Sequence, residues 1–149
     1  MRRLMLSLII FITSFAAVPA WAKSDPIYTS WRNNKAVEGY DVVSFFSGKP
    51  ILGNGALTER YMGVIWHFSS QANLDLFKTN PDAFAPQYGG YCAWAVAKNK
   101  LAKGSAKHWH VEDGKLYLNF NKKVKRHWDK DRREFIEQAD GYWPEILED

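Results

Sequence analysis

The sequence predicts an α+β fold in which two β-hairpins form a small antiparallel sheet packed with short helices. Two turn dipeptides, Met62-Gly63 and Asp113-Gly114, are flanked by segments rich in apolar and aromatic residues, a pattern typical of hairpins. The segments that follow space their apolar residues three or four apart, which is the helical period. With 46% hydrophobic residues among 149, the chain can bury the core of one domain. No low-complexity tract and no internal repeat is visible in the sequence.

The N-terminus predicts a cleavable secretory signal over residues 1–22. Arg2 and Arg3 give a positive start, residues 4–18 are apolar, and Ala20-Trp21-Ala22 has small residues where a signal peptidase reads them. We therefore expect cleavage after Ala22 and export by the general secretory route to the bacterial periplasm. The alternative is a retained membrane anchor, but the apolar stretch is shorter than the roughly 20 residues that span a bilayer as a helix.

The exported part is expected to begin with a leader segment, residues 23–35, and to continue as one domain over residues 36–149. The leader reads as a strand or coil in which Trp31 packs back on the core. Removing Arg2 and Arg3 lowers the formal net charge from +4 to +2. Such a small charge does not indicate nucleic acid as a partner, and no transmembrane anchor is expected after cleavage.

The first hairpin is predicted from residues 57–61 and 64–69. A two-residue loop pairs three residues of each strand: Tyr61 with Val64, Glu59 with Trp66, and Leu57 with Phe68. This register gathers the large apolar side chains on one face. Ser69 or Ser70 can cap the next helix, which runs to about Thr79 and ends or restarts at Pro81.

The second hairpin turns at Asp113-Gly114, a dipeptide that suits a type I′ turn. The loop pairs four residues of each strand: Glu112 with Lys115, Val111 with Leu116, His110 with Tyr117, and Trp109 with Leu118. One face then carries Trp109, Val111, Leu116, Leu118 and Phe120, and the opposite face carries His108, His110, Tyr117 and Asn119. Upstream, Gly89-Gly90 permits unusual backbone angles, and residues 91–97 are ambiguous between strand and buried helix.

The C-terminal part is predicted to be helical from Asn121 onward. Asp131 with Glu134 resembles a capping box, so we expect two short helices rather than one. Charge is divided sharply, because residues 121–133 contain seven bases and two acids, whereas residues 134–149 contain six acids and no base. The basic segment reads as a solvated helix face, and it could also make weak contact with an anionic membrane surface.

Four groups of residues after the leader carry a family resemblance. The first hairpin and its helices supply Tyr61-x-Gly63-x-x-Trp66-x-Phe68-Ser69-Ser70, Phe77, Asn80-Pro81 and Tyr88. The others are residues 37–46, residues 89–97, and residues 113–119 together with Ala139-Asp140 and Trp143-Pro144. The first group resembles the YHS domain, and the others resemble the exported, stand-alone branch of that family. Together they cover about residues 36–144.

The resemblance implies a small α+β unit, YHS/TRASH-like, related to metal-binding modules found beside copper-transporting ATPases and in metal-responsive regulators. Metal binding in the family rests on a Cys directly after the last aromatic residue of the hairpin and another Cys four residues on. Two such thiolates suit copper(I) or zinc. This chain has Ser69 and Asn73 at those positions, and neither is a good ligand for a soft metal. The exported branch implies no particular activity.

Cys92 is the main candidate site residue, since it is the one cysteine of the chain. It follows a Gly-Gly turn and could be a metal ligand, a reactive thiol or a small buried hydrophobe. His108 and His110 lie two apart on a strand, so their imidazoles could share one metal that Cys92 completes. The alternative is that His110 simply packs on Tyr117.

Three further residues are candidates for ligand binding. Asp41 could join a site, or could hold a loop by accepting backbone N–H bonds. Tyr91 and Trp94 flank Cys92 and could line an aromatic pocket, or belong to the core. No serine–histidine–acid order, paired-carboxylate motif or phosphate loop is present, so no catalysis is expected.

The sequence therefore predicts a periplasmic YHS-type binding module that holds a metal ion or a small ligand near Cys92. Copper, zinc, iron and haem are not distinguished by the residues. One alternative is a thiol-dependent redox or stress protein that uses Cys92 by intermolecular exchange. Another is a purely structural or interaction domain in which Cys92 is buried. Neither its protein partner nor its oligomeric state follows from the sequence.

Overall fold

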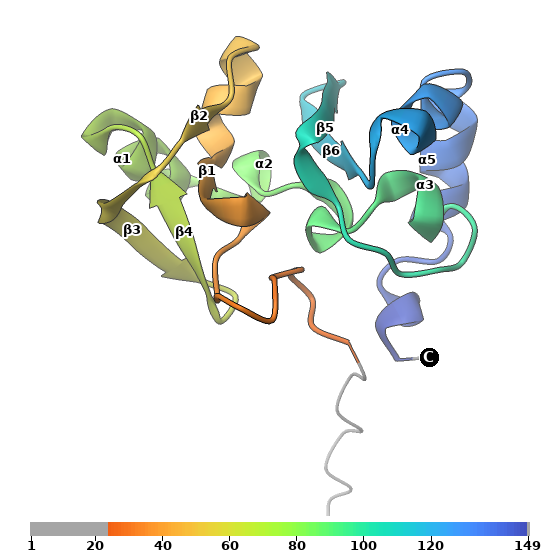
Figure 1. Cartoon of the computed structure of the whole chain (residues 1–149), viewed down its shortest axis with the longest axis horizontal. Coiled ribbons are helices and arrows are strands. Elements are labelled where there is room, and N and C mark those ends of the chain that lie inside the picture. The colour runs from red at the N-terminus through yellow and green to blue at the C-terminus, as the bar shows by residue number, and fades with distance from the viewer. Residues whose placement is uncertain (1–23, 149) are drawn as a thin grey trace, which may run out of the picture.

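The computed structural model describes residues 24–148, and it confirms an α+β fold (Figure 1). The predicted signal over residues 1–22, with its cleavage after Ala22, lies outside the described residues. Its strands form three separate two-stranded antiparallel sheets, so the two predicted hairpins do not merge into one sheet. Within residues 24–148, no helix has both the length and the hydropathy needed to cross a membrane.

The first group of elements contains four strands and two 3₁₀ helices, followed by two α-helices. In chain order these are η1 (Val37–Gly39), β1 (Tyr40–Asp41), η2 (Val42–Ser47), β2 (Ile51–Leu52), β3 (Asn54–Tyr61), β4 (Val64–Phe68), α1 (Gln71–Thr79) and α2 (Pro81–Phe84). This group lies to the left in Figure 1, with α2 near the middle.

The second group contains the remaining elements of the chain. Its elements are η3 (Gln87–Gly90), α3 (Ala93–Val96), β5 (Ser105–Glu112), β6 (Lys115–Asn119), α4 (Lys122–Trp128), α5 (Arg132–Asp140) and η4 (Glu145–Leu147). Its strands β5 and β6 and its helices α3, α4 and α5 lie to the right in Figure 1.

The turns of both hairpins are where the sequence predicts them. All four predicted pairs of the second hairpin are confirmed. In the first hairpin, Tyr61 pairs with Val64 and Glu59 with Trp66, but the predicted pair of Leu57 with Phe68 is wrong. A bulge between Asn54 and Thr58 shifts the register, so that Phe68 pairs with Asn54. An inserted residue of this kind breaks the two-residue alternation on which the prediction depends.

The helix boundaries follow from side-chain caps. Ser70 Oγ accepts a hydrogen bond from the Asn73 N–H at the start of α1, and Pro81 is the first residue of α2. The predicted pair of C-terminal helices is confirmed, because Asp131 caps α5 through the Glu134 N–H. The ambiguous segment, residues 91–97, has both characters, because Tyr91 and Cys92 form isolated β-bridges and Ala93–Val96 form the short helix α3.

The backbone repeats itself at an offset of 51 residues, which corrects the expectation that the chain has no internal repeat. Within residues 24–148, every residue with positive φ has a partner 51 positions away. The pairs are Val37 with Tyr88, Glu38 with Gly89, Gly39 with Gly90, Gly48 with Asn99, Met62 with Asp113, and Gly63 with Gly114. We call residues 37–87 the first repeat and residues 88–138 the second repeat.

Strand pairing and close packing follow the same offset. The pair Asn54–Phe68 and its bulge correspond to Ser105–Asn119 and an equivalent bulge. Two glycines have matching surroundings, because a Cβ on Gly53 would lie 2.5 Å from His67 Cβ and one on Gly104 would lie 2.8 Å from Leu118 Cβ. The sequence hides the repeat because most equivalent side chains differ in size and polarity.

Each repeat contains an aromatic pair at equivalent positions, although the core around the first pair also takes in Ala106, Leu116 and Leu118 of the second hairpin. Trp66 packs on Phe77 with ring centroids 5.0 Å apart in the first repeat, and the equivalent Tyr117 packs on Trp128 at 5.5 Å in the second. The face of the second hairpin that we expected to carry His108, His110, Tyr117 and Asn119 outward is therefore partly buried, since Tyr117 and Asn119 belong to the interior.

The leader connects the two repeats. Tyr28 N–H donates to Gly89 O of the second repeat, and Asn34 O of the leader accepts the Ile65 N–H of the first. Trp31 does not pack on the core, since 89% of it is exposed. The prediction for this residue is wrong because the leader is anchored through its backbone and through other side chains instead.

Candidate functional site

The two repeats place Asp41 and Cys92 at equivalent positions. Each follows a Gly-Tyr pair, and each is the residue before a short helix, η2 or α3. Asp41 is fully buried and Cys92 is 1% exposed. The same backbone frame therefore surrounds a carboxylate in the first repeat and a thiol in the second.

In the first repeat this position is closed by hydrogen bonds. Asp41 Oδ1 accepts the Val43 N–H at 3.0 Å. Asp41 Oδ2 accepts the Ser69 N–H at 2.8 Å, the Ser69 hydroxyl at 2.5 Å and the Asn73 side-chain amide at 2.7 Å. Ser69 and Asn73 are the positions at which the resemblance places metal-binding cysteines, and here both are used to satisfy one buried carboxylate.

In the second repeat the equivalent position opens into a cavity of about 540 Å³. The counterparts of Asp41, Ser69 and Asn73 are Cys92, Phe120 and Val124, and all three line the cavity. None of the three offers the polar side chain needed to rebuild the hydrogen bonds of the first repeat. The second repeat therefore lacks the hydrogen bonds that close this position in the first repeat, and a cavity is present there instead.

The cavity has an apolar lining and two lysines. Seven of its nine lining residues are uncharged: Cys92, Trp94, Ala95, Leu101, Ala102, Phe120 and Val124. The other two are Lys98 and Lys100. Lys98 Nζ donates to Gln138 Oε1 at 3.4 Å, whereas Lys100 makes no side-chain hydrogen bond or ion pair with any residue of 24–148. A site of this volume and composition suits a small organic molecule.

Burial controls the chemistry of Cys92. Removal from water raises the pKa of its thiol, because the thiolate loses hydration. Backbone N–H groups of Ala95, Phe120 and Trp94 act in the opposite direction but do not reverse this shift. The Sγ atom lies 3.7 Å from Asn119 Oδ1, so the thiol is the form that this site favours.

Asn119 is a polar residue next to Cys92. The sequence pattern places it on the outer face of the second hairpin, but the structure buries it. It is fully buried at the end of β6, and its Oδ1 also accepts the Trp94 N–H at 3.3 Å. Its Nδ2 has no hydrogen-bond partner among the described residues. The equivalent residue in the first repeat is the buried Phe68, so an amide here replaces an apolar ring.

The two candidate histidines are not brought to Cys92. His110 Nε2 lies 2.7 Å from Glu112 Oε2, and the same carboxylate oxygen accepts a hydrogen bond from Arg132 Nε at 2.6 Å. The Arg132 guanidinium lowers the pKa of Glu112. The His110 ring packs against Trp128, with centroids 5.9 Å apart. Within residues 24–148, no three His, Cys, Asp or Glu side chains are close enough to hold a metal ion, and this includes the set of Cys92, His108 and His110.

The three candidates for ligand binding have different positions. Trp94 lines the cavity. Tyr91 does not, since its hydroxyl donates to Asp25 O at 2.8 Å and its ring packs on Tyr28. Asp41 lies in the closed position of the first repeat, where it holds a loop.

Sequence reasoning missed most of the cavity lining, namely Ala95, Lys98, Lys100, Leu101, Ala102, Phe120 and Val124. One signal could have found it. Gly39-Tyr40-Asp41 and Gly90-Tyr91-Cys92 share a pattern, and both hairpin turns end in Gly at the same offset from it. Aligning these points superposes Phe120 and Val124 on Ser69 and Asn73.

Comparisons with protein-family models, curated proteins and solved structures find no match to this chain.

Proposed function

We propose that this chain is an exported, periplasmic binding module of the YHS type that holds a small amphipathic organic anion in the cavity beside Cys92. The apolar part of the ligand lies against Trp94, Phe120 and Val124. Its negative group lies near Lys98 and Lys100. The module has no catalysis of its own.

The observation that carries this proposal is the contrast between the repeats. A buried carboxylate and its donors fill the position in the first repeat, and an apolar-lined cavity of about 540 Å³ takes its place in the second. Small-molecule sites commonly have volumes of about 300–1,000 Å³ and apolar walls with a few polar groups. The dimensions and the chemistry both fit a ligand of that kind.

An organic anion fits this cavity better than a metal cation. The positive charge of Lys100, with Lys98 nearby on Gln138 and Phe135, repels copper, zinc or iron ions and attracts a carboxylate or a similar anion. Thiol exchange at Cys92 is also opposed, because its Sγ is buried and its thiol pKa is raised. We therefore prefer ligand binding to thiol-dependent redox chemistry.

Calorimetric titration with octanoate tests the proposal. Octanoate has an apolar chain and one carboxylate, so we expect it to bind the purified protein. Val124→Trp fills the cavity and should abolish binding. Lys100→Gln should weaken binding by about threefold, the usual size for a partly exposed charge pair.

Lys49→Gln is the matched control, because Lys49 is the counterpart of Lys100 in the first repeat and does not line the cavity. It should bind octanoate like the parent protein. Circular dichroism shows whether Val124→Trp is folded. If this variant does not fold, the comparison of Lys100→Gln with Lys49→Gln still tests the proposal. The proposal is wrong if octanoate does not bind, or if Lys49→Gln weakens binding as much as Lys100→Gln.

A further inference from the structure

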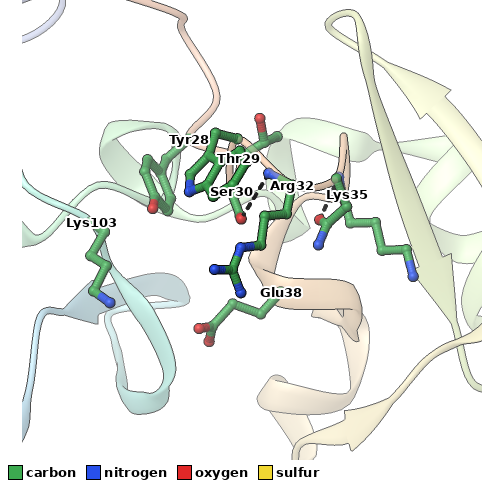
Figure 2. A pocket seen from close by; sticks show the side chains of 9 residues that line it. Tyr28, Thr29, Ser30, Arg32, Lys35, Glu38 and Lys103 are labelled. Carbon is green, nitrogen blue, oxygen red and sulfur yellow. Dashed lines mark hydrogen bonds between the residues drawn. The ribbon is translucent and has the colours of Figure 1, made fainter.

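A second hollow lies where the leader crosses between the two repeats. Its volume is about 540 Å³, and it is lined by residues 28–33 of the leader together with Lys35, Glu38 and Lys103 (Figure 2). We call it the leader groove. The two hollows have no lining residue in common.

The leader groove carries an excess of positive charge. Arg32, Lys35 and Lys103 line it, and none of them forms an ion pair with another residue of 24–148. In Figure 2 the side chains of Arg32 and Glu38 reach into the same space, with Lys103 across from them. The Lys103 ammonium also lies 5.5 Å from the Phe120 ring centre, a contact that leaves its charge uncompensated.

Glu38 is the one acid in the lining, and its carboxylate is already bonded. Its Oε2 accepts the Ala106 N–H at 2.8 Å and the Ser105 hydroxyl at 3.2 Å. These bonds tie the first repeat to β5 and reduce the ability of Glu38 to neutralise the neighbouring cations. Two cationic side chains, Arg32 and Lys103, therefore lie near one carboxylate that is engaged elsewhere, while the Lys35 side chain points away from it (Figure 2).

The backbone at Glu38 is left-handed, with a φ of 56°. The counterpart in the second repeat is Gly89, which adopts the same conformation with a φ of 59°. Glycine is required at that position for space, because a Cβ on Gly89 would lie 1.8 Å from Pro26 O of the leader. Glu38 instead carries a side chain that lines the groove.

Trp31 supplies an exposed aromatic ring at the same groove, with the Arg32 guanidinium over one face and the other face open. It is 89% exposed, and the Arg32 guanidinium carbon lies 4.9 Å from its ring centre. Exposed tryptophans beside arginines are enriched where proteins bind partners or ligands, because a rigid ring buries much apolar area on binding. The indole face and the cations are therefore available to one ligand.

We propose that the leader groove binds a small organic anion that carries a flat ring. Its negative group lies between Arg32 and Lys103, and its ring stacks on Trp31. This site shares no lining residue with the cavity beside Cys92, although Lys103 of the groove contacts Phe120 of the cavity. An aryl phosphate is the simplest compound with both features.

Calorimetric titration of the purified protein with phenyl phosphate tests the site. We expect binding in dilute buffer that weakens as salt is added, since screening reduces attraction between exposed charges. Arg32→Gln and Trp31→Ala should each weaken binding by about fivefold, within the range for exposed charge pairs and aromatic contacts. Inorganic phosphate, which has no ring, should bind more weakly than phenyl phosphate.

Lys122→Gln is the control, because it removes the same charge from an exposed position on α4 outside both hollows. It should bind phenyl phosphate like the parent protein. The assignment is overturned if Lys122→Gln weakens binding as much as Arg32→Gln, or if Trp31→Ala binds normally. It is also overturned if the protein binds phosphatidylglycerol vesicles but not phenyl phosphate, because the groove would then recognise a membrane surface.

Discussion

At the residue scale, the contrast between Asp41 and Cys92 explains how the same backbone arrangement is closed in the first repeat and forms a cavity in the second. Asp41 accepts four hydrogen bonds from Val43, Ser69 and Asn73, so its burial is compensated. Cys92 has the same backbone setting and needs no such compensation, because a thiol is a weak donor and behaves as a small hydrophobe. The exchange of a charged residue for an apolar one releases the neighbouring positions to line a cavity.

Substitution of Asp41 measures how firmly the first repeat is closed. In Asp41→Asn an NH₂ group replaces one of two acceptor oxygens and faces N–H and O–H donors. We expect the free energy of unfolding to fall by about 2–4 kcal/mol, since bonds to a charged group are lost and donors remain unsatisfied. Urea unfolding measures the change.

Glu137→Gln is the control for this substitution, since it neutralises an exposed acid on α5. Surface substitutions of this kind usually change stability by no more than about 0.5 kcal/mol. Equal stability of Asp41→Asn and Glu137→Gln would show that the four hydrogen bonds do not stabilise the fold.

At the scale of elements, the hairpin turns could be predicted from the sequence, whereas the bulges could not. Met62-Gly63 and Asp113-Gly114 have φ values of 50° and 78°, and of 48° and 71°, as type I′ turns require. Local residue chemistry determines such turns. The bulge before Thr58 and the burial of Tyr117 and Asn119 depend instead on what packs on the hairpins from elsewhere in the chain.

Replacement of the turn glycines tests this account of the hairpins. Gly63→Val and Gly114→Val should each destabilise the protein by about 1–3 kcal/mol, because a β-branched residue is strained at positive φ. No atom lies within 4 Å of a Cβ built on either glycine, so the cost comes from the backbone alone.

Asparagine variants separate backbone strain from other effects. Asn tolerates the left-handed region better than Val, so Gly63→Asn and Gly114→Asn should retain more stability in thermal unfolding. If Val and Asn lower the melting temperature equally, these positions do not owe their glycine to positive φ.

At the scale of the whole molecule, the two repeats pack directly on each other, because the apolar face of β5 and β6 enters the core of the first repeat. The leader and the contacts of Glu38 with β5 add hydrogen bonds between them. The α+β class and most element boundaries could be predicted, because they depend on local patterns. The duplication has one sequence signal, the shared Gly-Tyr pair and the turn glycines at an offset of 51 residues, but few other equivalent residues are identical. That signal aligns Phe120 and Val124 with Ser69 and Asn73, but it does not show a cavity, because residues 92–102 and 120–124 meet there only in the folded chain.

The proposed function rests on the claim that the second repeat binds a ligand where the first repeat is closed. Amide chemical-shift mapping during titration of the ¹⁵N-labelled protein with octanoate tests this claim most directly. We predict shifts concentrated at Cys92, Ala95, Phe120 and Val124, with little change at the equivalent residues of the first repeat, Asp41, Ser69 and Asn73. Shifts of equal size in both repeats, or none near Cys92 at saturating octanoate, would contradict the account.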